Sequence, residues 1–196
     1  MKNTKGFFRA YFLEQRRLLI GNEVQQKSEQ IAMLISQLFA QHGSRVIHCF
    51  LPIRERAEVD TLGIISRAKA EGIQVLIPKV NTKTQEIDSC LWEKETTLVL
   101  SKWGVLEPQD AVPFEQLEQI DCVVTPLLAY DSLGYRVGYG KGFYDRFFGR
   151  CRADVLKAGV SFFEPVDIIT DSEPHDVRLD YCITPTQIWD FTQQNR

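Results

Sequence analysis

One run of residues, Gly134 to Arg146, concentrates the groups that could do chemistry. Its sequence, GYRVGYGKGFYDR, holds four glycines, three cations and one carboxylate. Glycine has no Cβ, so Gly138, Gly140 and Gly142 can turn consecutive backbone N–H groups toward one anion. Lys141 and the two arginines add positive charge to the same loop. The run therefore predicts a binding site for phosphate.

The segment after Gly142 is expected to begin a helix, whose unpaired N–H groups would face the same anion. The run differs from two common phosphate motifs. It is not a P-loop, because Gly140-Lys141 is followed by Gly142 and not by Ser or Thr. It is not a dinucleotide fingerprint, because Phe143 stands where a third glycine is expected. The alternative is a glycine-rich surface hairpin whose charges are solvated.

A second set of cations lies near the N-terminus. Lys5 and Arg9 are four residues apart and Arg16 follows seven residues after Arg9, so a helix would present all three along one stripe. They would form a second cationic arm. The alternative, which spacing alone favours, is a solvated amphipathic helix packed through Phe8 and Phe12.

Another carboxylate, Glu58, follows a predicted strand at 46–51. In a loop at that end of the strand it could accept hydrogen bonds from the amines of a ligand. Capping of the next helix is the alternative for this segment. Capping suits Asp60 or Thr61, because Glu58 lies too far upstream.

Two aspartates are candidates for a metal site. Asp145 is the carboxylate nearest to the glycine-rich run, and Asp176 lies on a polar segment near the C-terminus. Mg²⁺ takes few carboxylates plus phosphate oxygens and water, so one or two aspartates near a nucleotide suffice. The alternatives for Asp145 are a helix-terminal charge and an ion pair with Arg146. His175 lacks any histidine at metal-binding spacing, so a surface position without a role is expected.

The elements that must position these groups follow from apolar periodicity. Apolar residues repeat at helical spacing from 28 to 41, and Gly43 stands at the C-cap position. Short β-rich runs predict buried strands at 46–51, 73–77, 122–127 and 158–162. Further expectations are a helix at 61–71, an additional strand at 86–93 and a short helical segment at 114–118. This alternation predicts an α/β fold with a largely parallel sheet, and the glycine-rich run lies soon after the strand at 122–127, where such sheets bind ligands.

The composition of the chain limits the classes of protein to which it can belong. With 196 residues, 44% of them hydrophobic, the chain is expected to form a single domain over residues 1–196. The formal net charge of −3 and the absence of blocks of like charge argue against nucleic acid as a partner. Five widely spaced cysteines suggest neither a disulfide framework nor a zinc site, and no signal peptide or membrane span is visible. A cytoplasmic, soluble protein is expected.

A resemblance to a known family rests on residues 126–131 and 134–145. The segments PLLAYD and GYRVGYGKGFYD resemble the signature of the 5-formyltetrahydrofolate cyclo-ligase family. The similarity extends to Lys5 and Arg9, to residues 50–51, 58–61 and 103–108, and to residues 176–180, and so covers nearly the whole chain. It implies a three-layer, Rossmann-like α/β sandwich with a largely parallel central sheet.

The resemblance also implies the reaction. 5-Formyltetrahydrofolate would be converted into 5,10-methenyltetrahydrofolate with ATP and Mg²⁺, through phosphorylation of the formyl oxygen, with release of ADP and phosphate. The ATP-binding residues would be Lys5, Arg9, Arg136, Val137, Gly138, Tyr139, Gly140, Lys141, Gly142, Phe143 and Tyr144. The folate would contact Leu51, Glu58, Tyr139, Gly140, Lys141, Gly142 and Phe143. Lys141 and Arg136 would be catalytic, and Asp145 and Asp176 would hold the metal.

The chain departs from the family pattern in two places. The loop at 52–57 is longer and more charged than usual, and Lys2 could replace Lys5 as the amine that faces ATP. Two other functions stay open, namely another small ATP-dependent ligase or kinase, and a non-catalytic folate- or nucleotide-binding protein. The expected partners are ATP and a folate, without nucleic acid or membrane, and the expected state is a monomer.

Overall fold

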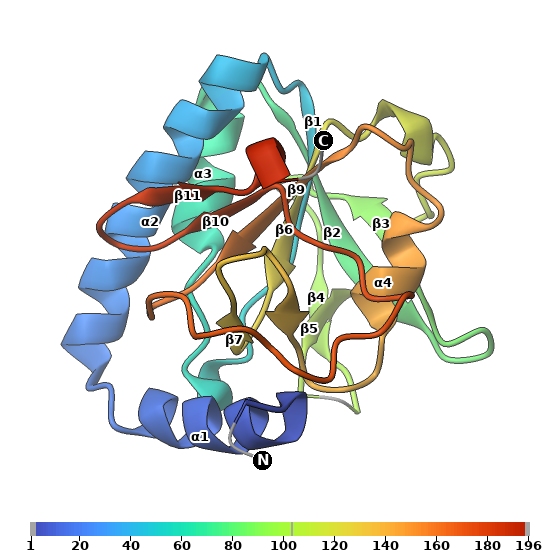
Figure 1. Cartoon of the computed structure of the whole chain (residues 1–196). Helices are drawn as coiled ribbons and strands as arrows, with labels where there is room; N and C mark the ends of the chain where they lie inside the picture. Colours follow the sequence, from blue (N-terminus) through green and yellow to red (C-terminus); the bar gives the residue numbers. More distant parts are fainter. Residues whose placement is uncertain (1–2, 103, 195–196) are drawn as a thin grey trace.

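A computed structural model describes residues 3–102 and 104–194 of the chain, so Lys2 and Trp103 lie outside the described residues. The strands of the main sheet are β1 (Val46–Cys49), β2 (Gln74–Asn81), β3 (Glu86–Leu91), β6 (Cys122–Pro126), β9 (Leu156–Val160), β10 (Tyr181–Ile183) and β11 (Ile188–Asp190). Their order is β11-β10-β9-β6-β1-β2-β3 (Figure 1). The five inner strands are parallel, and β3 and β11 pair antiparallel at the two edges. The predicted α/β fold with a largely parallel sheet is therefore confirmed.

Helices cover both faces of this sheet. The helices are α1 (Lys5–Arg17), α2 (Gly21–His42), α3 (Leu62–Ala70) and α4 (Phe143–Phe148), with 3₁₀ turns at Arg54–Arg56, Leu117–Gln119 and Thr192–Gln194. Two small hairpins complete the structure, β4 (Leu98–Leu100) with β5 (Leu106–Pro108) and β7 (Ala129–Tyr130) with β8 (Arg136–Val137). Helices α2 and α3 lie on one side of the sheet, α4 lies on the other, and α1 lies beyond the carboxyl ends of the inner strands (Figure 1).

Alternate side chains of the strands explain why both faces must be covered. In β2, Val75 and Ile77 belong to the core cluster formed with α2 and α3, whereas Leu76 packs in the cluster that contains Phe147 of α4. Since successive side chains of a strand point to opposite faces, an apolar run such as this one is stable only between two layers.

The helix predicted at 28–41 is longer than expected. It begins at Gly21, because the Glu23 carboxylate accepts a hydrogen bond from the Ile20 N–H at 3.2 Å and so satisfies a free donor at the helix start. It ends as predicted, with Gly43 in the left-handed region at φ = 61°. The polar first turns of this helix carry no apolar stripe, which is why periodicity missed them.

One expectation is wrong, and two short strands of the main sheet were not predicted. Residues 114–118 do not form a helix: Phe114 donates from its backbone to Ser89 of β3, and a single 3₁₀ turn follows at Leu117–Gln119. Strands β10 and β11 were not predicted, because each has only three residues and no clear alternation. Within the described residues, no helix combines the length and the apolar character needed to cross a bilayer.

Candidate active site

A cavity of about 1160 Å³ opens at the carboxyl ends of β1, β2 and β6. Phe50 and Leu51 directly follow β1, Pro78 and Val80 lie in the second half of β2, and Pro126 ends β6. Strand β1 has β2 on one side and β6 on the other, so the chain winds outward in both directions from this point. Parallel sheets bind ligands at such switch points, and the sequence predicted the site at this end of the sheet.

The glycine-rich run forms one wall of the cavity. Gly140 and Gly142 have φ values of +85° and +65°, which side chains other than glycine rarely adopt. A Cβ on Gly140 would stand 3.4 Å from the guanidinium carbon of Arg9, so the loop lies directly against α1. The hairpin β7–β8 closes through residues 131–135, before the three glycines that line the cavity, so these glycines are not the turn of a surface hairpin.

Helix α4 begins directly after Gly142, as the sequence predicted. Its six residues give a small dipole, so the cations beside it supply most of the positive potential on this wall. These cations are Lys5, Arg9, Arg136 and Lys141.

Arg136 is the most constrained of these cations. Its side chain is only 6% exposed and donates to Asp145 Oδ1 at 2.7 Å and to the Val177 carbonyl. Burial lowers the pKa of Arg136, and the neighbouring Asp145 carboxylate opposes that shift. The ion pair therefore fixes the guanidinium at the cavity wall. The structure pairs Asp145 with Arg136 and not with Arg146, which instead donates to the Lys141 and Gln85 carbonyls.

Helix α1 presents Lys5 and Arg9 to the cavity. Lys5 pairs with Asp176, and Arg9 donates through Nε to the Gly138 carbonyl at 2.9 Å. Arg16, on the same stripe, is buried and donates to the Leu127 carbonyl. The expectation of a solvated amphipathic helix is correct for the packing of the two phenylalanines, which are buried, but wrong for Arg16.

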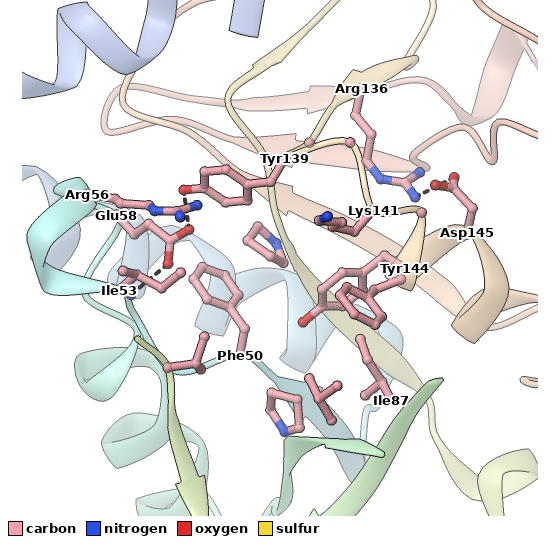
Figure 2. A pocket seen from close by; sticks show the side chains of 18 of the residues that line it. Phe50, Ile53, Arg56, Glu58, Ile87, Arg136, Tyr139, Lys141, Tyr144 and Asp145 are labelled. Carbon is pink, nitrogen blue, oxygen red and sulfur yellow. Dashed lines mark hydrogen bonds and ion pairs between the residues drawn. The ribbon is translucent and has the colours of Figure 1, made fainter. Parts of the chain in front are cut away.

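Glu58 is a buried carboxylate that reaches the glycine-rich run. Its Oε1 accepts from the Tyr139 hydroxyl at 2.5 Å, its Oε2 accepts from the Ile53 N–H at 2.7 Å, and Arg16 Nη1 lies 4.0 Å away (Figure 2). Burial raises the pKa of Glu58, while the two hydrogen bonds and the charges of Arg16 and Arg56 oppose the shift. Capping of α3 falls to Asp60, which accepts from the Leu62 N–H at 3.1 Å.

The loop at 52–57 explains how Glu58 reaches this position. It contains the 3₁₀ turn Arg54–Arg56, and Ala57 follows with φ = 43°. This fold of the chain brings the Ile53 N–H back to the Glu58 carboxylate. The charged side chains of the turn are exposed, so the unusual charge of the loop faces away from the core.

The wall opposite the cations is apolar. It consists of Leu13, Phe50, Leu51, Ile53, Pro78, Val80, Ile87, Val105 and Pro126, with the rings of Phe143 and Tyr144 beside them. Figure 2 shows Phe50, Ile87 and Tyr144 around the same space as Lys141 and Tyr139. An apolar wall that faces a few fixed polar groups is typical of sites for flat organic ligands.

Asp145 and Asp176 are the candidate ligands of Mg²⁺. The hydrogen bonds described for Asp145 fall on Oδ1, from Arg136 and the Val177 N–H, and those of Asp176 fall on Oδ2, from Lys5 and the Glu173 N–H. Each carboxylate therefore keeps its other oxygen available. Hard oxygen donors suit Mg²⁺, which needs few of them beside phosphate and water. No group of three or more His, Cys, Asp or Glu side chains is gathered for a metal among residues 3–102 and 104–194.

Three charged residues were not among the predicted contacts: Arg56 and Glu107 line the cavity, and Arg16 contacts the lining residue Tyr139. Arg56 places its guanidinium carbon 4.6 Å from the centroid of the Tyr139 ring, Arg16 donates to the Tyr139 hydroxyl at 3.0 Å, and Glu107 lines the cavity from β5. Of these, only Arg16 had a sequence signal, its place on the stripe of α1. His175, given no role, is exposed and lies 3.1 Å from the Glu173 carboxylate at the cavity margin.

Comparisons with known proteins agree on one family. Residues 1–185 match the model described as the 5-formyltetrahydrofolate cyclo-ligase family. The 5-formyltetrahydrofolate cyclo-ligase of Mycolicibacterium smegmatis is 29% identical over 187 residues, which cover 93% of this chain and 94% of the relative.

Two solved structures are similar over almost their whole length. A 5,10-methenyltetrahydrofolate synthetase from Mycoplasma pneumoniae superposes with a TM-score of 0.72 and 27% identity, over 92% of this chain and 98% of that one. The NMR structure of the Aquifex aeolicus 5,10-methenyltetrahydrofolate synthetase gives a TM-score of 0.81 and 25% identity, over 98% and 94% of the two chains.

Proposed function

The chain belongs to the 5-formyltetrahydrofolate cyclo-ligase family, and we propose that it carries out the reaction of that family in the cavity described above. It is a ligase that forms 5,10-methenyltetrahydrofolate from 5-formyltetrahydrofolate. In the proposed course, the formyl oxygen attacks the γ-phosphate of ATP and ADP leaves. N10 of the folate then attacks the activated carbon and loses its proton, and phosphate leaves with the former formyl oxygen.

This proposal rests on one observation: a cationic wall and an apolar wall line the same cavity. The cationic glycine-rich loop suits a polyphosphate, and the apolar wall with a buried carboxylate suits a pterin. The cavity volume of about 1160 Å³ exceeds the range of roughly 300–1,000 Å³ common for single ligands. Two substrates therefore have room to meet.

On the phosphate side, Lys5, Arg9, Arg136 and Lys141 would neutralise the charge of ATP. Phosphoryl transfer depends mainly on positioning and charge, so it needs no nucleophile from the protein. Arg136 is held rigidly by Asp145, and Lys141 is exposed on the loop. We assign Arg136 to orient the transferred phosphoryl group and Lys141 to neutralise the charge that develops on it.

On the folate side, Leu51 and its apolar neighbours would hold the flat ring, and Glu58 would accept hydrogen bonds from its N–H groups. Glu58 is suited to this role because the Ile53 N–H and the Tyr139 hydroxyl fix the orientation of the carboxylate. The segment from Tyr139 to Phe143 would contact both substrates, since it lies between the two walls.

Asp145 and Asp176 would hold Mg²⁺ through the oxygens that their ion pairs leave available. The ion would supply additional neutralisation of the phosphate oxygens. Lys5 and Arg136 keep both aspartates beside the phosphate wall. A cytoplasmic location and a monomeric state stay predictions; the five free cysteines support the former.

The experiment that tests the function is an absorbance assay. Purified protein is mixed with 5-formyltetrahydrofolate, ATP and Mg²⁺, and the near-ultraviolet band of the methenyl product is followed. An ATP-dependent rise is expected, with no rise when ATP is omitted. Folded protein that binds ATP but forms no product under these conditions would contradict the proposal.

A further inference from the structure

We propose that Tyr139 is a positioning residue, which holds the Glu58 carboxylate in its folate-binding orientation and ties it to the glycine-rich loop; this inference rests on the proposed function. Tyr139 connects the two walls of the cavity. Its backbone belongs to the loop that faces the phosphates, and its side chain extends to the folate wall (Figure 2).

Three charged side chains contact Tyr139, two at its hydroxyl and one at its ring. Arg16 Nη1 lies 3.0 Å from the hydroxyl oxygen and Glu58 Oε1 lies 2.5 Å from it. The guanidinium of Arg56 covers the ring, with its central carbon 4.6 Å from the ring centroid. The ring therefore contacts Arg56, whereas the hydroxyl contacts Arg16 and Glu58. Replacing Tyr139 with Phe removes only the contacts of the hydroxyl.

The direction of these hydrogen bonds follows from the chemistry of arginine. A guanidinium can only donate, so Arg16 must donate to the Tyr139 oxygen. The tyrosyl proton is then committed to Glu58 Oε1. The Ile53 N–H occupies one position on Oε2. Each carboxylate oxygen keeps a second lone pair, and the two occupied positions determine where those lone pairs point.

The hydroxyl also helps to keep Glu58 ionised. The charged and titratable groups that face Glu58 are Arg16 from α1, Arg56 from the 3₁₀ turn, Tyr139 from the loop and Tyr144 from α4. Burial raises the pKa of Glu58, and the Tyr139 hydrogen bond lowers it. Loss of that hydrogen bond would raise the pKa further, so that the carboxyl would become protonated at a higher pH than in the wild type. A protonated carboxyl is a poorer acceptor for the N–H groups of a pterin.

The test measures binding in place of turnover. The dissociation constants of 5-formyltetrahydrofolate and of a non-hydrolysable ATP analogue are determined by calorimetry from pH 6 to pH 9, for the wild-type protein and for Tyr139→Phe. The folate affinity of the variant is expected to fall about tenfold at the acidic end, as for a lost hydrogen bond to a charged group, and the loss is expected to shrink as the pH rises. Affinity for the ATP analogue should stay within about twofold, because the backbone of the loop is unchanged.

A matched control is Tyr135→Phe. Tyr135 lies in the turn of the β7–β8 hairpin, packs beside Arg178 and does not line the cavity, so the folate affinity of this variant should equal that of the wild type. Wild-type folate affinity in Tyr139→Phe at every pH would overturn the inference. So would a loss that is independent of pH and equal for both ligands, since that result indicates a displaced loop. A wild-type protein that fails to bind the folate at all would instead refute the proposed function, and the inference with it.

Discussion

Lys141 and Arg136 are two cations of one loop that differ in exposure. The Arg136 side chain is 6% exposed and is held by Asp145 and the Val177 carbonyl, whereas Lys141 is exposed. In the proposed mechanism Arg136 would orient the transferred phosphoryl group, and Lys141 would neutralise the charge that develops on it.

Replacing this lysine tests that distinction. Lys141→Ala is expected to lower kcat by about 10²- to 10³-fold, the usual effect of removing one group that stabilises developing charge. The melting temperature should hardly change, because the side chain is exposed. Lys83→Ala, in the turn between β2 and β3 and outside the cavity, is the control and should keep wild-type kcat. Normal turnover in Lys141→Ala would exclude the assigned role.

Glu58 offers a second test at the level of one residue. Glu58→Gln keeps the size of the side chain but removes its charge, so it should raise the KM for the folate about tenfold or more while the KM for ATP changes little. Steady-state kinetics with each substrate varied in turn measure both values. Glu71→Gln, at the exposed end of α3, serves as the control. Equal losses for both substrates would place Glu58 elsewhere in the mechanism.

Among the elements, α1 and the glycine-rich loop form a single unit. Arg9 of α1 bonds to the Gly138 carbonyl, and its guanidinium occupies the space in front of Gly140. Helix α1 therefore has a structural role as well as an electrostatic one, because its side chains also determine the path of the loop backbone. The loop needs glycine at position 140 because the backbone there has φ = +85°, which other residues rarely adopt.

Gly140→Ala should disturb this unit, because the backbone at this position, with φ = +85°, is strained for alanine. The loop should shift, and the affinity for an ATP analogue should fall about tenfold, measured by calorimetry. Gly21→Ala, at the start of α2, has no heavy atom within 4 Å and no positive φ, so it should bind ATP like the wild type. Unchanged affinity in Gly140→Ala would show that the loop tolerates a side chain there.

At the scale of the whole molecule, the buried His48 is expected to make the free energy of unfolding depend on pH. It lies fully buried in β1, with Nδ1 2.9 Å from the Ser89 hydroxyl and its ring 4.5 Å from that of Phe147. Burial lowers the pKa of His48 to about 3. In the unfolded chain the pKa of a histidine is about 6.5, so the unfolded state binds an additional proton between these two values.

Stability should therefore decline as the pH falls through that window. The contribution of His48 is complete above about pH 6.5 and is lost toward pH 3, at up to about 1.4 kcal/mol per pH unit. Urea unfolding of the wild type and of His48→Gln at pH 7, 6 and 5 measures the slope. The variant should be less stable at pH 7 but should lose less stability on acidification. Parallel slopes in the two proteins would show that His48 does not titrate in this range.

Whether a structural feature can be predicted from the sequence depends on whether it is determined by neighbouring residues or by residues far apart in the chain. Four of the five parallel strands (β1, β2, β6 and β9), the C-cap at Gly43 and the start of α4 after Gly142 follow from local patterns and were predicted from them. The short strands β10 and β11 were missed, since three residues carry too little periodicity. The helical pattern at 114–118 was overruled by pairing of Phe114 with the edge strand β3.

The candidate site shows the same difference between local features and long-range contacts. The residue types of the glycine-rich loop were enough to predict a phosphate site, because a loop is a local structure, whereas the spacing of Lys5 and Arg9 by itself favoured a solvated helix. Which groups bond to each other was decided only by the tertiary structure. Asp145 pairs with Arg136 and not with the adjacent Arg146, and Tyr139 meets Glu58 from 81 residues away. Such contacts depend on how separate segments pack around the ends of the sheet, and no spacing within one segment encodes that arrangement.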